Sequence, residues 1–369
     1  MSIVNLPSPT DLSGFYVVYN GSTNLEKKGI YGISHLLEHL VCKAIDPYQD
    51  ELDTLGITHN AYTSGNEVVF WMRGLDESLS KWRNKYVELL GNFDVSKEEF
   101  ENERNIVLQE YMDSFNDQSS NHWLNLDRKK FNNFNPIGLK EDLESLTYMD
   151  CLNYFETQFL NPSKIINVSK NVEFGADMEF MDRLSDTKIK MGNYDSIIQR
   201  DNDYNGKVSL IMVSNPVEKD FSKINFVNNM LSYGLQSPFY QEVREKRGLV
   251  YYIGTSMNRV NKQGYNSIYT MTSEENVQKI TDIIGTIFED LDKFLTKDRF
   301  NVIQQSTKLK LKESEINRYA NVNKWISPEG WSMEDLIDDI TYVEALATAD
   351  KYFKMDNFYI SRDDKEFLI

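Results

Sequence analysis

The segment from Gly32 to Val41 constrains this chain most, because it places two of only four histidines four residues apart with a glutamate between them. On an α-helix, residues four apart lie one turn above each other on the same face. His35 and His39 can therefore approach one ion, with Glu38 beside them. Aliphatic side chains recur at the helical period through the segment, and Ser34 is positioned to cap its start. The sequence predicts a buried helix that carries a metal site.

The order His-x-x-Glu-His is the inverse of the thermolysin-type zinc motif. Two neutral imidazoles suit zinc, a third protein ligand leaves the fourth position for water, and a nearby carboxylate can take a proton from that water. This arrangement is typical of peptide hydrolysis. The alternative is a helix whose histidines are merely hydrogen-bonded at the edge of a core, with no metal.

A second expected helix, residues 96–112, has Ser96 as its N-cap and acidic residues in its first turn. Glu103 and Glu110 are seven positions apart on it, which places both on one face after two turns. One of them can bind a metal while the other orients a ligand. Taken alone, such a pair on an acidic helix is usually a solvated face.

Together the two segments resemble the pitrilysin family of zinc peptidases, the inverzincins that include insulin-degrading enzymes and mitochondrial processing peptidases. That family has a glutamate pair of this separation some seventy residues after its inverted motif. The resemblance implies that His35, His39 and Glu110 bind one Zn²⁺ per chain, with Glu103 as a supporting carboxylate. It also implies a zinc-dependent endopeptidase that cleaves short or unfolded polypeptides with a zinc-bound water activated by Glu38.

Residues 56–72 predict a β-hairpin that turns at 64–66. Its first strand resembles the family's Asn-Ala-x-Thr strand, which implies that Asn60 and Ala61 pair with the substrate backbone as an added β-strand does. His59 is expected to be a surface or substrate-edge histidine rather than a ligand. Since the run 14–19 is the earliest strand-like segment recognised, the chain is expected to lack the first strand of the family.

The second half offers another match to the family, in the run 234–251. The resemblance implies that Arg244 and Tyr251, seven positions apart, reach the zinc site from the second domain. The guanidinium would bind a substrate carbonyl and the phenol would donate to the oxyanion. Read without the resemblance, residues 244–247 are a charged helix end. His122 lies in a polar region and is expected to be a solvent or hinge histidine.

A chain of 369 residues predicts two domains. The sequence pattern places an N-terminal catalytic domain at residues 1–175, a linker at 176–204 and a C-terminal domain at 205–369. The expected class is α+β, and the resemblance implies two homologous domains, each an antiparallel-rich sheet covered by helices, that form a clamshell around a chamber. Long helices are expected at 76–93, 275–294 and 299–319, and a helical tail at 335–353.

Acidic residues outnumber basic ones by 57 to 40, for a net charge of -17. Such a surface is a poor partner for nucleic acid; it could attract basic peptides or serve only solubility. No apolar run approaches the roughly 20 residues that span a bilayer, and no signal peptide is recognised, so we expect no membrane partner and a cytoplasmic location.

The two cysteines, Cys42 and Cys151, are far apart and do not predict a disulfide. Cys42 is expected to be a buried thiol rather than a ligand. The resemblance implies a homodimer, or a heterodimer with a related subunit. The competing hypothesis for function is a non-catalytic peptide-binding or assembly subunit of the same family.

Overall fold

The structure is a computed structural model that describes residues 1–20, 22–131, 135–171, 173–175, 206–260, 263–320, 322–326, 339–363 and 366–367. The chain forms two compact units. Unit 1 comprises Met1–Asn116, Asp127–Ser196 and Glu315–Gly330, and unit 2 comprises Asp117–Leu126, Ile197–Ser314 and Trp331–Ile369. The expected linker at 176–204 lies outside the described residues.

Unit 1 contains a five-stranded sheet in the order β1-β5-β2-β4-β3. Its strands are β1 (Ser2–Pro7), β2 (Leu12–Asn20), β3 (Thr58–Thr63), β4 (Glu67–Leu75) and β5 (Lys164–Ser169). β1 runs parallel to β5 and the other pairs are antiparallel. The β3–β4 hairpin confirms the expected one, and β3 forms one edge of the sheet.

The expectation that the first strand is missing was wrong, because β1 forms the other edge of this sheet. Its six residues pair with Lys164–Ser169 through the backbone, while all its side chains are exposed or only partly buried. Edge strands of this kind carry no long apolar run. The residues therefore gave no strong strand signal.

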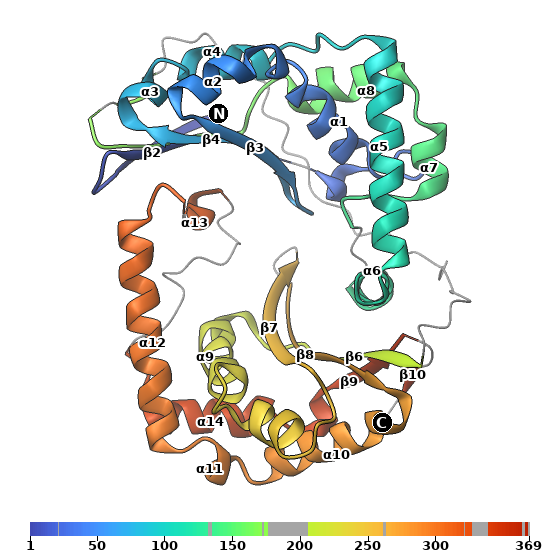
Figure 1. The fold of residues 1–369 in the computed structure, drawn as a ribbon, viewed down its shortest axis with the longest axis vertical. Helices are drawn as coiled ribbons and strands as arrows, with labels where there is room; N and C mark the ends of the chain where they lie inside the picture. Colours follow the sequence, from blue (N-terminus) through green and yellow to red (C-terminus); the bar gives the residue numbers. More distant parts are fainter. Residues whose placement is uncertain are drawn as a thin grey trace. The chain divides into compact units, whose positions relative to one another are not determined.

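Alternate residues of β2 point to opposite faces of the sheet. Phe15, Val17 and Tyr19 pack with the helices, whereas Tyr16 and Val18 pack with residues from α13 (Asn323–Ile326). Figure 1 shows α2, α3 and α4 on the helical side of β2, β4 and β3. The helices of the unit, apart from α13, are α1 (Ile33–Cys42), α2 (Gln49–Leu55), α3 (Asp76–Ser80), α4 (Arg83–Leu90), α5 (Lys97–Asn116), α7 (Lys140–Ser145) and α8 (Tyr148–Tyr154).

The single helix expected at 76–93 is two helices, α3 and α4, broken at Lys81 and Trp82. Trp82 and Arg83 are adjacent and both almost fully buried. Arg83 Nη2 binds Asp76 Oδ1 at 2.9 Å, and Trp82 Nε1 donates to Glu51 at 3.1 Å. A continuous surface helix buries a single stripe of side chains, so it does not bury two large residues that are adjacent in sequence and have different partners. The break allows both side chains to turn inward.

Four strands of unit 2 repeat the topology of unit 1, whereas the outermost strand differs: β1 comes first in the chain and runs parallel to β5, and β10 comes last and runs antiparallel to β9. The sheet of unit 2 has the order β10-β9-β6-β8-β7, with all described pairs antiparallel. β6, β7, β8 and β9 take the places that β2, β3, β4 and β5 take in unit 1. The strands are β6 (Lys207–Ser214), β7 (Ile253–Val260), β8 (Gln263–Ser273), β9 (Tyr359–Arg362) and β10 (Glu366–Phe367). The expected α+β class with two antiparallel-rich sheets is confirmed.

Helices α9 (Phe221–Ser232), α10 (Glu274–Glu289) and α14 (Tyr342–Tyr352) form one hydrophobic core with the sheet of unit 2. The helix expected at 275–294 is α10 followed by the short α11 (Leu291–Phe294), and the one at 299–319 is α12 (Lys297–Ile316). Part of the expected tail helix lies outside the described residues, and its described part is α14. Within the described residues, no helix combines the length and apolar character needed to cross a bilayer.

His122 is buried, which corrects the expectation of a solvent or hinge histidine. It lies on α6 (Gln118–Phe131), in the stretch that belongs to unit 2. Its Nδ1 is 2.9 Å from Ser209 Oγ on β6, and its Nε2 is 2.8 Å from Ser361 Oγ on β9. These partners are far away in sequence, so the polar residues around His122 did not reveal them.

Candidate metal centre

Helix α1 begins at Ile33, and its N-terminus is capped by a glutamate from the preceding loop. The carboxylate of Glu26 accepts from the backbone N–H of Gly32 at 2.8 Å and of Ser34 at 2.9 Å. The oxygens of this carboxyl thus satisfy backbone N–H groups that the start of a helix leaves without an intrahelical partner. The expectation that Ser34 caps the helix was therefore wrong: Ser34 lies buried inside the first turn, and Gly32 occupies the N-cap position with a φ of 97°.

The loop that leads into α1 is held by a second carboxylate. Asp142 on α7 accepts from the backbone N–H groups of Gly29 and Tyr31, both at 3.0 Å. Gly138 packs so tightly here that a Cβ on it would lie 2.3 Å from the carbonyl oxygen of Tyr31. Burial of Glu26 raises the pKa of its carboxyl to about 7. These contacts fix the start of the helix that carries both histidines.

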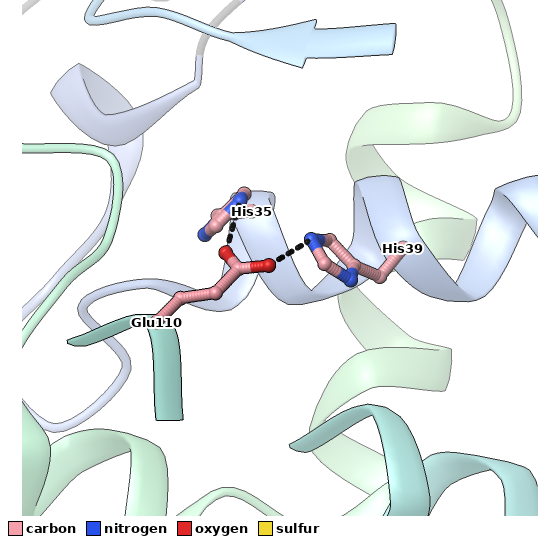
Figure 2. Close-up of side chains that lie close together, drawn as sticks. All are labelled: His35, His39 and Glu110. Carbon is pink, nitrogen blue, oxygen red and sulfur yellow. Dashed lines mark ion pairs between the residues drawn. The ribbon is translucent and has the colours of Figure 1, made fainter. Parts of the chain in front are cut away.

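His35, His39 and Glu110 lie together, as Figure 2 shows. His35 Nε2 is 3.7 Å from Glu110 Oε2, and His39 Nε2 is 3.8 Å from Glu110 Oε1. One donor atom from each of the three residues lies within 4.8 Å of the others. The histidines come from α1 and the glutamate from α5, whose expected Ser96 cap is present as a reciprocal bond with Glu99. Two imidazole nitrogens and one carboxylate oxygen are a donor set that fits zinc.

Glu103, one of the more deeply buried residues of α5, supports His39 from behind. Its Oε2 is 3.1 Å from His39 Nδ1, and its Oε1 is 2.9 Å from Lys43 Nζ. Because a carboxylate only accepts, His39 Nδ1 carries a proton, and in the neutral imidazole the lone pair is then on Nε2, the nitrogen nearer Glu110. The bond to Glu103 also raises the pKa of Lys43, so its ammonium charge is retained.

His35 is held in its neutral form by its surroundings. Burial, with a smaller contribution from the nearby His39, lowers the pKa of His35 to about 4. A neutral imidazole is the form that binds a metal. Within the described part of the chain, the buried Nδ1 of His35 has no hydrogen-bond partner, unlike that of His39.

Glu38 is buried next to His39 and receives a hydrogen bond from the end of β3. Thr63 Oγ1 donates to Glu38 Oε2 at 2.5 Å. Burial raises the pKa of Glu38, and the Thr63 bond opposes that shift by stabilising the ionised form. Sequence reasoning named neither Thr63 nor the supporting Glu26 and Lys43 as site residues. Two of them left a signal in the resemblance: Thr63 as the threonine of the Asn-Ala-x-Thr pattern, and Glu26 as the glutamate that precedes the metal helix.

Asn60 and Ala61 lie on β3, at the edge of the sheet of unit 1. The side chain of Asn60 accepts from the backbone N–H of Ala61 at 2.8 Å. His59 Nε2 is 3.0 Å from Gln49 Oε1, and the ring lies outside the His35, His39 and Glu110 cluster.

Burial raises the pKa of Cys42 to about 12, which keeps this thiol uncharged.

Arg244 and Tyr251 are in unit 2 and contact each other. The guanidinium carbon of Arg244 lies 5.0 Å from the centre of the Tyr251 ring and 4.5 Å from that of Tyr240. Arg244 also donates to the Tyr240 hydroxyl. Tyr251 is 84% exposed, which leaves its phenol free to meet another molecule.

Two α+β units that share a four-stranded topology, the first with an inverted His-x-x-Glu-His helix against a glutamate pair, define the class of two-domain inverzincin proteins. Residues 8–139 match the model of insulinase (peptidase family M16), and residues 185–307 match that of the peptidase M16 inactive domain. The chain belongs to this pitrilysin-type peptidase family.

Some similar proteins match most of this chain and others about half of it. An uncharacterised zinc protease of Rickettsia felis is 24% identical over 87% of this chain and 85% of its own length. A probable mitochondrial-processing peptidase subunit beta of Arabidopsis thaliana is 22% identical over 49% of this chain and 35% of its own. The crystal structure of a protease from Helicobacter pylori has a TM-score of 0.79 at 16% identity, covering 98% of this chain and 96% of that one.

Proposed function

We propose that this protein is a zinc-dependent endopeptidase that cleaves short or unfolded polypeptides. The observation that carries the proposal is the meeting of His35, His39 and Glu110, whose donor atoms lie within 4.8 Å of one another beside the buried carboxyl of Glu38. The names of the zinc proteases among its relatives support the same activity. Among the described residues this cluster offers three protein ligands. A set of three favours a catalytic zinc site, since structural zinc sites are usually closed by four protein ligands.

We assign His35, His39 and Glu110 as the ligands of one Zn²⁺ per chain. Zinc bound by three such ligands supplies a Lewis acid that polarises a carbonyl group and acidifies water. Glu103 acts behind the ligands: by accepting from His39 Nδ1 at 3.1 Å it fixes the tautomer and the orientation of that ring. The ammonium group of Lys43, whose Nζ is 2.9 Å from Glu103 Oε1, balances the charge of that carboxylate.

Glu38 is the general base in this proposal. Its Oε2 accepts from Thr63, and a proton taken from the attacking water would go to a carboxylate oxygen and later to the leaving amine. Burial, which raises its pKa, brings the carboxyl closer to the pH at which it can both accept and donate. This behaviour matches a residue that acts first as a base and then as an acid.

The peptide would bind in an extended form along the free edge of β3 beside Asn60 and Ala61, with backbone pairing at Ala61, because the backbone of Asn60 faces β4. Such pairing selects unfolded segments because a folded substrate has no free strand to offer. Arg244 and Tyr251 are proposed to contact the bound peptide, with the guanidinium on a carbonyl and the phenol on the oxyanion. The exposure of Tyr251 supports this role.

A non-catalytic peptide-binding or assembly subunit is the competing function. One observation favours keeping it: the model matched by residues 185–307 is described as an inactive domain. Relatives named as subunits of the mitochondrial-processing peptidase suggest that the chain pairs with a related subunit or with its own copy. In an inactive subunit of that kind, zinc would bind and peptides would remain intact.

A mixed library of short unstructured peptides tests the proposal. Zinc-loaded protein is expected to cleave them, and both a chelator and the Glu38→Gln variant are expected to abolish cleavage, with zinc binding kept in the variant. The matched control is Glu98→Gln, an exposed glutamate in the first turn of α5, which should cleave like the wild type. Hydrolysis that survives Glu38→Gln would refute the assignment of the base.

A further inference from the structure

Thr63 is the last residue of β3, and its side chain and its backbone face different surroundings. Its strand forms the edge of the sheet, since among the described strands β3 pairs with β4 alone, in the order β1-β5-β2-β4-β3. Side chains of β3 alternate in exposure, with residues 59, 61 and 63 partly buried and 58, 60 and 62 exposed. Thr63 therefore belongs to the inward-facing set, and its hydroxyl lies on Glu38.

The backbone of Thr63 belongs to the free edge of the strand. Ser64 N donates to Glu67 O at 2.8 Å across the turn, which makes 64 and 67 a hydrogen-bonded pair. Pairs along an antiparallel ladder alternate, so the pairs of Thr63 with Val68 and of Ala61 with Phe70 are non-hydrogen-bonded. The backbone groups of Ala61 and Thr63 consequently point away from β4. The bond from Ala61 N to the Asn60 side chain at 2.8 Å agrees with this direction.

The hydroxyl of Thr63 fixes one oxygen of Glu38. It donates to Oε2 at 2.5 Å, and in the described residues no other hydrogen bond to this carboxylate is found. Glu38 is 8% exposed and lies on the helix turn between His35 and His39. A single charge-assisted bond thus sets the orientation of the side chain and leaves Oε1 available.

We propose that Thr63 is a positioning residue that links the docking of an extended peptide on the free edge of β3 to the orientation of Glu38. A peptide paired with the backbone of Thr63 holds the strand end in place, and the hydroxyl of the same residue holds the carboxylate that meets the scissile bond. This inference rests on the proposed peptidase function. It adds a residue that acts through Glu38 and touches no reacting atom itself.

The test compares Thr63→Val with Thr63→Ser in the zinc-loaded full-length chain. Valine keeps the shape and the backbone edge but removes the donor, so kcat for a cleaved library peptide should fall by about 10- to 100-fold while KM and zinc affinity stay within about threefold. Serine keeps the donor and should restore most of kcat. Thr58→Val makes the same change at the exposed start of β3, away from Glu38, and should behave like the wild type.

Crystal structures of the metal-free wild type and Thr63→Val give a readout that needs no activity. Glu38 should have one conformation in the wild type and a different one, or several, in the variant. Wild-type kcat in Thr63→Val, equal losses in the valine and serine variants, or an unchanged Glu38 conformation would overturn the inference. If the wild type cleaves no peptide, the peptidase proposal fails separately, and the Glu38 conformations still decide whether Thr63 positions that residue.

Discussion

Three carboxylates around α1 have different roles because their immediate neighbours differ. Glu26 receives two backbone N–H groups at the helix N-terminus. Glu38 receives a single hydroxyl from Thr63, and Glu103 lies between the His39 ring and the Lys43 ammonium. At the scale of the residue, these partners decide whether a carboxylate caps a helix, takes up a proton or orients a ligand.

Glu103→Gln should weaken zinc binding by about 10- to 100-fold. The amide removes the charge that pairs with Lys43 and weakens the bond that orients His39, and losses of this size are typical of groups behind metal ligands. Competitive titration with a chromophoric chelator measures the affinity. Glu98→Gln, on the same helix and exposed, is the control. Equal zinc affinity in Glu103→Gln and wild type would contradict the supporting role.

Glu26 should make stability depend on pH. Burial raises its folded-state pKa to about 7 from the ordinary 4.5, so between these values the folded chain holds a proton that the unfolded chain has released. The contribution of this carboxyl to stability is therefore present at low pH and is lost as the pH rises through about 7. Relative to Glu26→Gln, chelated wild type should lose about 2 kcal/mol between pH 5.5 and 7.5.

Urea unfolding at the two pH values measures this difference, since the linear extrapolation gives the free energy of unfolding of each variant. A constant difference between wild type and Glu26→Gln would mean that the carboxyl titrates alike in both states. That result would contradict the buried environment of Glu26.

The residues of the candidate site could be predicted from the sequence only where helical spacing fixes them. Four and seven positions on a helix place His35 with His39 and Glu103 with Glu110 on shared faces. The partners Thr63 and Lys43 depend on how β3 and α5 pack against α1, which local spacing does not encode. Ser34 was wrongly expected as the cap because Glu26, eight positions away, provides the carboxylate instead.

At the scale of the element, β3 is hydrogen-bonded to β4 along one edge, and its other edge is free in the described structure. Its hydrogen-bonded residues face β4, while the backbone of Ala61 points outward. Proline, which lacks an N–H group, is tolerated on strands only where that group faces solvent. Proline should therefore be tolerated where the N–H of β3 points outward and should disrupt the strand where the N–H faces β4.

Ala61→Pro should keep the fold and zinc affinity and raise KM for peptides by about tenfold, because it removes an outward donor that a paired peptide would use. Asn60→Pro removes an N–H that faces β4 and should destabilise the hairpin. Steady-state kinetics and thermal unfolding distinguish the two variants. An unchanged KM in a folded Ala61→Pro chain would argue against peptide pairing along β3.

His122→Ala should lower the free energy of unfolding by about 2–4 kcal/mol. Because His122 is 4% exposed, the substitution leaves a cavity. It also removes the ring nitrogens that contact the hydroxyls of Ser209 and Ser361. Because His122 lies in unit 2, zinc affinity at the histidines of α1 should not change. A loss below about 0.5 kcal/mol would show that α6 is held by other contacts.

Helices and strands whose apolar residues recur at a regular spacing could be predicted from the sequence. Elements that depend on contacts with distant residues could not. The β3–β4 hairpin, α5, α10 and α12 follow from local pattern. β1 was missed because backbone pairing with β5 defines it, and the break between α3 and α4 arises from the inward turn of Trp82 and Arg83. The buried position of His122 likewise depends on β6 and β9.

At the scale of the whole molecule, the chain is two units that share the topology of four strands, and unit 1 holds the complete candidate metal centre. The shared strand order appears in the structure, although sequence identity between the halves gave no sign of it. The central claim is that this centre is catalytic. It predicts that one zinc ion per chain is both necessary and sufficient to activate unit 1, with Arg244 and Tyr251 of unit 2 assisting the substrate.

The most direct measurement is the initial rate of peptide cleavage as zinc is titrated into metal-free protein, for wild type and Glu38→Gln. We predict that the wild-type rate rises linearly and saturates at one equivalent of zinc per chain, while Glu38→Gln binds the same equivalent without cleavage. A rate that is independent of zinc, or one bound zinc per chain with no cleavage of any peptide, would contradict the account.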